Sequence, residues 1–222
     1  MVSIVEFCSE HNYLGRSQER SYISEISDLF VGRRSNELEL EYCTPQQNNH
    51  GTIKIWRGLE IDLTTEPIWE ASLEKYKGKF TVVADAINFN SGAYVIAISV
   101  DESNRAIAAT NTLLNGQVVL RGSSYIAVTA KQPNRVVTIF TIPPNVGAVH
   151  QETWATIYKG DKPNMGEKLA QGYAPLNESS GVIKVEFDKG SLKTGDTYNV
   201  CLSVGDQIKT ISAAYVFQYL LP

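Results

Sequence analysis

Short runs in which apolar and polar residues alternate occur along the whole chain, and this two-residue period is the feature that most restricts its fold. Val2–Phe7, Glu37–Tyr42, Thr52–Trp56 and Val182–Phe187 show the alternation most regularly. The other runs are Lys79–Val83, Tyr94–Val100, Val118–Leu120, Val136–Ile142, Ala155–Tyr158, Tyr198–Val204 and Ala213–Phe217. Because successive side chains of a β-strand point to opposite faces of a sheet, each run predicts a strand with one buried face.

Clusters of Gly, Pro, Asn and Asp separate these runs, as expected for turns between strands. The clusters are Gln46–Gly51, Asn88–Gly92, Pro143–Gly147, Lys189–Gly190 and Thr194–Asp196. Many short strands separated by such turns are typical of β-sandwiches and β-barrels. The chain has 222 residues, of which 43% are hydrophobic, so its length fits one large or two small folded domains.

One segment departs from the two-residue period. Trp69, Leu73 and Tyr76 lie at positions i, i+4 and i+7, and they follow Thr65 and Pro67. A threonine can cap a helix, and a proline suits its first turn. We therefore expect one short helix in this segment, serving as a crossover between sheets.

Four segments of the first half match four segments of the second half in the same order, at a period of about 100 residues. The matches are Leu38–Pro45 with Val137–Pro144, Gly51–Gly58 with Thr153–Gly160, Phe89–Val100 with Leu192–Val204, and Ala106–Thr110 with Thr210–Ala214. The sequence thus predicts two copies of one sandwich, residues 1–113 and 114–222. The short segment Leu113–Gly116 is the expected linker, and it favours a fixed relation between the domains.

The spacing Leu192-x-x-Gly195-x-x-Tyr198 resembles the tyrosine corner of immunoglobulin-like and fibronectin type III domains, in which a Tyr bonds back across the preceding turn. Gly92 and Tyr94 hold the matching positions in the first copy. Trp154–Lys159, followed by Ile211–Gln218, also resembles the strand pattern of the immunoglobulin-like SKICH domains. The resemblance implies an all-β protein of two consecutive Greek-key β-sandwiches of immunoglobulin-like type.

The N-terminal segment carries a second resemblance. Phe7–Ser17, with an aromatic residue at each end of a short loop followed by Gly-Arg, resembles the opening of a βγ-crystallin Greek key. A crystallin-like domain followed by an immunoglobulin-like one would resemble a calcium-dependent cell-adhesion protein. Arg33–Asn36 lacks the acidic residues that a crystallin-type Ca²⁺ site uses, so we expect no cofactor, with Ca²⁺ as the alternative that this resemblance implies.

Two groups of residues are candidate ligand contacts. Trp56, Trp69 and Tyr76 could form an aromatic platform for a sugar ring, although aromatic residues on alternating strands are more often core. His50 and His150 lie in polar loops after the proline-bearing strands. They could act as ligand groups or pH-sensing groups, or they could be solvated loop residues. The polar loop Lys159–Gly166 lies where sandwiches present binding loops.

Catalytic and metal-binding patterns are not found in the sequence. It has no phosphate-binding glycine loop, no Gly-x-Ser-x-Gly elbow and no His or Cys spacing typical of a metal site, so we expect no enzyme. Three cysteines, Cys8, Cys43 and Cys201, are too few for a disulfide scaffold, and we expect them to be reduced. Cys8 and Cys43 could face each other in the first domain.

Charge and hydropathy restrict the partners. The net charge of −4 divides into −6 for residues 1–112 and +2 for residues 113–222. This asymmetry could reflect head-to-tail attraction between molecules, a weakly basic face for an anionic surface, or ordinary solvated surface. A pI near 5.5 disfavours nucleic-acid binding. No run of about 18 apolar residues is present, so no transmembrane segment is expected. The first residues do not resemble a signal peptide, which predicts a cytoplasmic protein or release by a non-classical route.

Taken together, the sequence predicts a soluble, non-catalytic binding or adhesion protein. Its partner would be a protein or a glycan at a cell surface, bound through sandwich loops or sheet faces, with a homo-oligomer as one option. The alternatives are a calcium-dependent cell-adhesion protein and a soluble toxin or insecticidal protein that targets cell surfaces.

Overall fold

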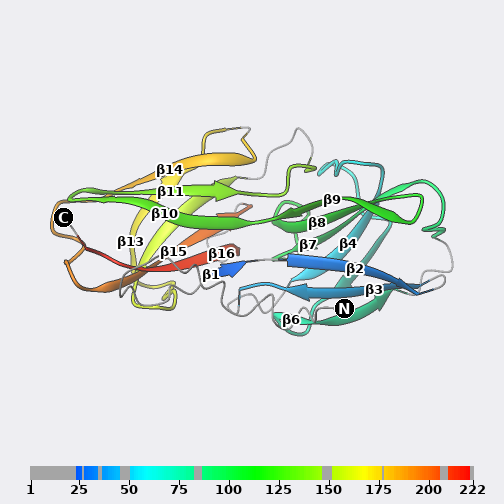
Figure 1. Cartoon of the computed structure of the whole chain (residues 1–222), viewed down its shortest axis with the longest axis horizontal. Coiled ribbons are helices and arrows are strands. Elements are labelled where there is room, and N and C mark those ends of the chain that lie inside the picture. The colour runs from blue at the N-terminus through cyan, green and yellow to red at the C-terminus, as the bar shows by residue number, and fades with distance from the viewer. Residues whose placement is uncertain are drawn as a thin grey trace, which may run out of the picture.

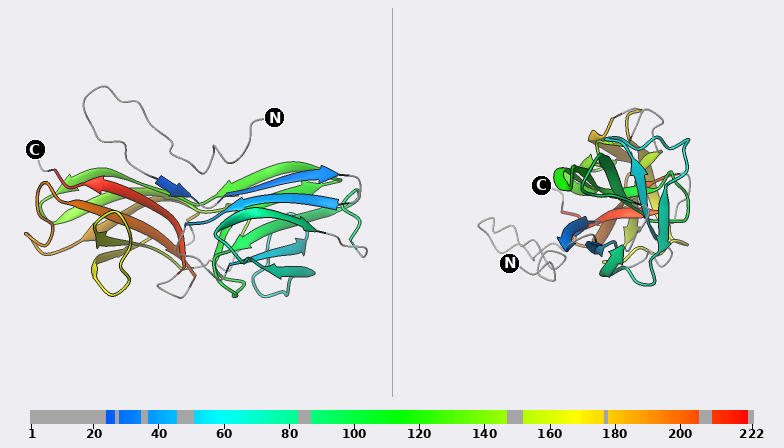
Figure 2. Two further views of the ribbon diagram at one scale, coloured as in Figure 1. Left: turned by 90° about the horizontal axis from the view of Figure 1, so that it is seen from below. Right: turned by 90° about the vertical axis from the view of Figure 1, so that its right-hand side faces the viewer.

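The computed structural model describes residues 24–26, 28–34, 37–45, 51–82, 87–146, 152–176, 178–205 and 210–220. Sixteen strands cover most of these residues, and none of them is in a helix. The strands form four antiparallel sheets, which pack as two sandwiches lying end to end (Figure 1, Figure 2). The prediction of an all-β chain with two sandwiches is confirmed.

Each sandwich pairs a three-stranded sheet with a five-stranded one. In the first, β2 (Asp28–Arg34), β3 (Glu37–Cys43) and β6 (Lys77–Val82) form the smaller sheet, in the order β2-β3-β6. The larger sheet has the order β5-β4-β7-β8-β9. Its strands are β4 (Thr52–Arg57), β5 (Trp69–Ser72), β7 (Ala93–Ser99), β8 (Ile107–Leu114) and β9 (Gln117–Ser123).

The second sandwich repeats this arrangement. Its smaller sheet has the order β10-β11-β14, and its larger sheet has the order β1-β16-β15-β12-β13. The strands are β1 (Ser24–Ile26), β10 (Tyr125–Gln132), β11 (Arg135–Thr141), β12 (Thr153–Lys159), β13 (Lys168–Tyr173), β14 (Ser180–Glu186), β15 (Thr197–Val204) and β16 (Ile211–Gln218). Numbered from β2 and from β10, strands one, two and five make one sheet in each sandwich, and strands three, four, six and seven make the other. This is the Greek-key order of an immunoglobulin-like sandwich.

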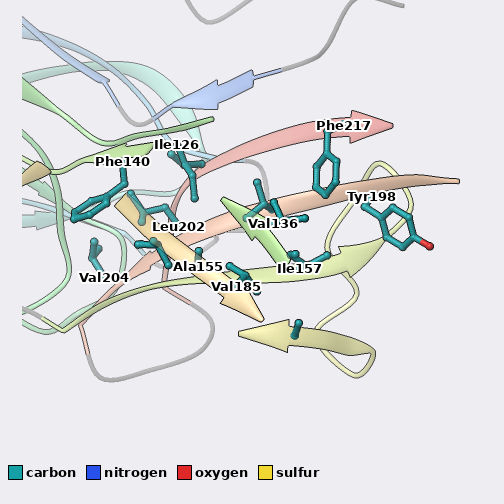
Figure 3. Close-up of a cluster of buried hydrophobic side chains, with 14 of the residues drawn as sticks. Ile126, Val136, Phe140, Ala155, Ile157, Val185, Tyr198, Leu202, Val204 and Phe217 are labelled. Atoms are coloured by element: carbon teal, nitrogen blue, oxygen red, sulfur yellow. The ribbon is translucent and has the colours of Figure 1, made fainter. Parts of the chain in front are cut away.

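Inward-facing residues of both sheets build the core of each sandwich. In the second, Val136 and Phe140 of β11 pack with Ile157 of β12 and Leu202 of β15 (Figure 3). These side chains alternate with outward-facing ones along each strand, as the two-residue period requires. Leu38, Ile55, Ile96 and Ile98 are among the residues that do the same in the first sandwich.

In three of the four predicted repeat matches, the matched residues occupy equivalent strand positions and point to the same face of their sheets. Ile55 and Ile157 face the cores of their sandwiches, and Trp56 and Tyr158 lie on the opposite sheet surface. A bulge interrupts the β7–β8 pairing between Ile98 and Ser99, and an equivalent one interrupts the β15–β16 pairing between Leu202 and Ser203. The shared bulge confirms that the two sandwiches are copies of one fold.

The fourth match pairs the equivalent strands β3 and β11, but its alignment is shifted by one residue. The predicted alignment sets Leu38 of β3 against Val137 of β11, but Leu38 faces its core and Val137 alternates with the buried Val136 and Thr138. A slip of one residue reverses the face of every side chain in a strand. The structural equivalent of Leu38 is therefore next to Val137 in the chain.

The predicted helix at Trp69–Tyr76 is wrong. Trp69–Ser72 is strand β5, and it pairs with β4 through Ile55–Trp69 and Thr52–Ser72. Pairing with a sheet edge satisfies the backbone groups of this segment. Trp69 and Ala71 are half-buried while Glu70 and Ser72 are exposed, so the period here is two residues.

The expected linker Leu113–Gly116 is the end of β8 and the turn of a β-hairpin. Asn115 and Gly116 form the two-residue turn, both with positive φ (50° and 79°), and Leu114 pairs with Gln117 across it. Along the chain, the expected division at residue 113 thus falls next to the β8–β9 turn.

The first strand of each repeat lies in the sheet of the other repeat. Strand β9 pairs with β8 of the first sandwich, and the chain then enters the second sandwich as β10. Strand β1 pairs with β16 of the second sandwich, and the chain then enters the first as β2. Two chain segments, β1–β2 and β9–β10, therefore cross the junction, and the repeats exchange their leading strands (Figure 1).

Candidate functional site

Trp56 is not available for stacking on a sugar. Its side chain is 2% exposed and packs with Ile61, Val95 and Ile107 on the outer surface of the larger sheet. Its indole Nε1 donates a hydrogen bond to the carbonyl oxygen of Thr65, at 3.1 Å. The segment around Ile61 folds over this surface and covers the ring.

Trp69 and Tyr76 do not share a platform with Trp56. Trp69 pairs with Ile55, whose side chain is in the core, so it lies on the opposite face of the sheet from Trp56. Its ring packs edge-on against Phe80, with 5.7 Å between the centroids. Tyr76 is half-buried in the turn before β6, with the amine of Lys77 5.6 Å from its ring centroid. The structure therefore places Trp56 and Trp69 on opposite faces of the larger sheet.

The two tyrosines of the predicted corners bond back across the turns before their strands. The hydroxyl of Tyr94 donates to the carbonyl oxygen of Asn88, at 3.2 Å. The hydroxyl of Tyr198 accepts a hydrogen bond from the backbone N–H of Lys193, at 2.8 Å. Gly92 and Gly195 have φ of 89° and 94°, a region that favours glycine. These four residues shape the turns.

The remaining predicted residues lie elsewhere or outside the described part of the chain. His50, His150, Cys8 and the crystallin-like segment 7–17 are outside the described residues. In the loop Lys159–Gly166, Met165 packs against the buried Tyr158 and Cys201, so part of the loop covers its own sheet. Cys43 is disulfide-bonded, which corrects the expectation of a reduced thiol there, and Cys201 is a free buried cysteine.

Loops of both sandwiches meet at the junction, so this end of each sandwich is covered. Val100 and Ala106 flank the loop between β7 and β8, and they belong to the same buried cluster as Phe140 and Val204 of the second sandwich. A side chain at Gly205 would come within 3.2 Å of Ala106. Sandwich loops often carry binding sites, but this contact buries several of them.

A sheet face is exposed instead. The outward side of the β10-β11-β14 sheet carries a row of apolar residues: Ala127, Ile139 and Val182 are direct neighbours across the three strands. Ile139 is 40% exposed and Val182 is 45% exposed. Half-buried Val137 and 36%-exposed Tyr125 extend the row along the sheet. We call these five residues the apolar face.

Polar groups flank the apolar face, and the charged outward-facing residues of its three strands lie at one end. At that end Arg135 is 3.8 Å from the carboxylate of Glu186, donates to the Gln132 side chain at 2.7 Å, and lies near exposed Lys184. The opposite end carries the uncharged row of Tyr125, Thr141 and Ser180. An apolar centre with a polar rim is the pattern of a protein-interaction surface.

The first sandwich shows that the fold itself does not require an apolar surface here. On its equivalent β2-β3-β6 sheet, the outward residues of β3 are Glu37, Glu39 and Glu41. Glu41 forms an ion pair with Lys79 on the neighbouring strand. Two copies of one sheet thus carry opposite surfaces, a charged one in the first sandwich and an apolar one in the second.

The apolar face is not among the sites predicted from the sequence, although the sequence contains a signal for it. Val136–Ile142 reads Val-Val-Thr-Ile-Phe-Thr-Ile, which is apolar at both alternating sets of positions rather than at one. A strand with one solvated face alternates cleanly, whereas a run that is apolar throughout indicates that both faces are covered. The excess apolar residues of this run, Val137 and Ile139, are those of the apolar face.

Membrane spans and metal sites are not found within the described ranges. No helix there is long and apolar enough to cross a membrane. Among the same residues, no three His, Cys, Asp or Glu side chains are grouped so that they could hold a metal ion.

Comparisons with known proteins give no family. No protein-family model and no curated protein matches the sequence. Among solved structures, the FN1–FN3 domains of chicken CNTN1 align over 88% of this chain and 67% of theirs, with 11% identity and a TM-score of 0.30. A DUF3823 family protein from Bacteroides ovatus aligns over 87% of this chain and 96% of its own, with 12% identity and a TM-score of 0.34.

Proposed function

We propose that this protein is a non-catalytic interaction module that binds a second copy of itself through the apolar face. The observation that carries the proposal is the outward-facing apolar row Ala127, Ile139 and Val182, in which Ile139 and Val182 are exposed, on a sheet whose counterpart in the first sandwich is charged. Burying such a row against another protein removes apolar surface from water. Contact with water alone gives no reason for an apolar row on this sheet.

The distribution of charge favours a second copy as the partner. In a two-fold contact between identical faces packed antiparallel, each charged end, with Arg135, Lys184 and Glu186, lies over the uncharged end of the other copy. The Ile139 side chains then lie near the centre. The outward-facing residues of the three strands then bring no like charges together, which lowers the electrostatic penalty for self-association.

The experiment is sedimentation of the full chain over a range of concentrations. Wild-type protein is expected to be a dimer that dissociates on dilution. Ile139→Asp places a carboxylate in the centre of the contact and should weaken the dimer at least about tenfold, which is about 1.4 kcal/mol. Its thermal unfolding should stay near wild type, because residue 139 is on the solvent side of the sheet.

Leu59→Asp is the matched control. Leu59 is 52% exposed, but it lies in the first sandwich in the segment after β4, away from the apolar face. This variant should dimerise as wild type does. A wild-type protein that stays monomeric at every concentration overturns the proposal, as does an equal effect of the two substitutions.

The alternatives from the sequence stay predictions. Glycan binding, calcium-dependent adhesion and a toxin role have no support from a contact between described residues, whereas the self-binding proposal has the apolar face. Binding of a different protein partner would use the same face, and it is the outcome expected if the wild-type chain is monomeric.

A further inference from the structure

One buried amine of the first sandwich is held against a side-chain amide. Lys54, in β4, is 2% exposed, and its Nζ donates to Oδ1 of Asn104 at 2.6 Å. Asn104 lies in the loop between β7 and β8, and the same Nζ also donates to the carbonyl oxygen of Glu102 at 2.7 Å. A primary amine that has lost a proton is a nucleophile toward a carbonyl carbon. The structure therefore places two groups that can react with each other in direct contact.

We propose that Lys54 and Asn104 form a covalent isopeptide bond within one chain. The Nζ of Lys54 attacks Cγ of Asn104, a new C–N bond forms, and the bond from Cγ to Nδ2 breaks. The two protons that the Lys54 ammonium group loses leave with Nδ2 as an ammonium ion, so atoms and charge balance. The step needs no oxidant, no cofactor and no second substrate.

Carboxyl groups lie beside both reacting groups. Glu70 of β5 is the register partner of Lys54, and its carboxylate oxygen is 3.7 Å from Nζ. This carboxylate can accept the proton that the ammonium group must lose before it attacks. On the amide side, Nδ2 of Asn104 is 3.4 Å from a carboxylate oxygen of Glu66. A carboxyl group there can pass a proton to the departing nitrogen.

The loop that carries Asn104 is fixed by its own hydrogen bonds. Oδ1 of Asp101 accepts from the backbone N–H of Ser103 at 2.8 Å and from its hydroxyl at 2.7 Å. The hydroxyl of Thr52, on β4, donates to the carbonyl oxygen of Asp101 at 3.2 Å. The amide of Asn104 is therefore held beside the amine. Holding two reactants in this way replaces a chance encounter by an effective concentration of roughly 10⁵–10⁸ M when their orientation is right.

A second lysine–amide pair shows what burial adds. Nζ of Lys168 donates to Oε1 of Gln171 at 3.0 Å, but Lys168 is exposed and Gln171 is half-buried. Water competes for both groups there, and a long exposed side chain moves among many rotamers. We therefore expect this pair to stay unlinked. Lys54 has little such freedom, because its side chain is buried.

The bond would anchor a loop that packs against the second sandwich. A Cβ at Gly205 of the second sandwich would lie 3.2 Å from the carbonyl oxygen of Arg105, the residue after Asn104. Linking Asn104 to β4 therefore fixes one side of the junction to the centre of a sheet. The proposal does not use the apolar face, so it is independent of the proposed function.

The experiment is mass spectrometry of the full-length chain after incubation at neutral pH, intact and after digestion with trypsin. Wild-type protein is expected to be lighter by one ammonia and to give a branched peptide that joins residues 54 and 104. Trypsin should no longer cut after Lys54, because its amine is acylated. Asn104→Ala should keep the full mass and give the ordinary peptide that ends at Lys54.

Two glutamate substitutions test the proton transfer. Glu70→Gln removes the base and should lower the linked fraction at least about tenfold, while its exposed side chain makes loss of the fold unexpected. Glu60→Gln is the matched control, since Glu60 is exposed in the segment after β4, and it should link as wild type does.

A wild-type chain without the branched peptide overturns the proposal, even if ammonia is lost at another residue. Equal linked fractions in Glu70→Gln and Glu60→Gln would overturn the role of Glu70. A branched peptide that joins residues 168 and 171 would show that contact alone, without burial, is sufficient, and it would contradict the argument from the buried amine.

Discussion

Individual residues explain why the aromatic positions singled out in the sequence are structural. Trp56 and Tyr158 hold equivalent positions on the outer surfaces of the two larger sheets, and both are covered by the segment that follows their strand. Two residues before Trp56, Lys54 is 2% exposed, and its amine donates to the Glu102 carbonyl at 2.7 Å and the Asn104 side chain at 2.6 Å. A buried ammonium group needs such partners.

The burial of Tyr158 gives the protein a pH-dependent stability. Burial raises its pKa from 10.0 to about 12, and Cys201 adds to the rise. The folded state therefore holds this proton more tightly than the unfolded state does. The resulting stability is complete below pH 10 and is lost as the pH rises to about 12, by at most about 2–3 kcal/mol. Urea unfolding at a series of pH values measures the loss.

Tyr158→Phe removes the titrating group and keeps the ring. In this variant the free energy of unfolding should fall less steeply between pH 10 and pH 12 than in wild type. Burial also raises the pKa values of Tyr42 and Tyr219, so a smaller decline should persist. An unchanged slope in Tyr158→Phe would contradict the assignment.

At the scale of elements, short connections decide which strands pair. The β8–β9 hairpin depends on a two-residue turn whose residues both have positive φ, Asn115 at 50° and Gly116 at 79°. Asn-Gly is the sequence best suited to this turn, because Gly has no Cβ and Asn tolerates the left-handed region. The same residues were predicted to form a linker, since a linker and a turn share their composition.

Gly116→Ala should therefore destabilise the protein by about 1–2 kcal/mol, which is the usual cost of a left-handed conformation for a residue with a Cβ. Urea unfolding measures the change. Gly166→Ala is the control, because Gly166 is exposed and an added Cβ would meet only the Asn164 side chain, at 3.6 Å. If both variants lose the same stability, the turn geometry is not the cause.

At the scale of the whole molecule, the junction makes the two sandwiches one unit. Asn145, from the loop after β11, reaches the outer surface of the first sandwich and is 4% exposed. Its amide oxygen accepts from Thr110 at 2.5 Å, its amide nitrogen donates to Thr112 at 2.9 Å, and its carbonyl oxygen accepts from the N–H of Ile61 at 2.9 Å. One side chain thus links both sandwiches.

Asn145→Ala should cost on the order of 2–4 kcal/mol of unfolding free energy, because it leaves two buried threonine hydroxyls without this partner. Asn134→Ala, in the exposed turn between β10 and β11, should stay within about 0.5 kcal/mol of wild type. Both are measured by urea unfolding. A loss below about 0.5 kcal/mol for Asn145→Ala would show that its polar contacts do not stabilise the junction.

The apolar cluster across the junction predicts a single unfolding transition for the chain. Val100, Ala106 and Ala108 of the first sandwich share one buried cluster with the core of the second. Independent domains with small polar contacts would unfold separately. The Asn145→Ala variant is the one expected to separate the transition into two steps.

The sequence by itself determined the local structure and the duplication. The two-residue period of segments such as Glu37–Cys43 and Ser180–Glu186 predicts strands, because successive side chains of a strand point to opposite faces of the sheet. The pattern Ile55-Trp56-x-Gly58 recurs as Ile157-Tyr158-x-Gly160, and Tyr94 recurs as Tyr198. These recurrences predict two copies of one sandwich. These properties depend on neighbours in the chain, which a sequence displays directly.

Only the tertiary structure decided which strand completes which sheet and which surfaces stay exposed. That β1 pairs with β16, almost two hundred residues away, depends on how the two sandwiches meet. Whether Trp56 is buried depends on the segment around Ile61, and Ile139 is exposed because no strand in the described part of the chain covers its side chain. Pairing and burial are set by contacts between distant segments, so alternation predicts that a strand has two faces but not what covers each one.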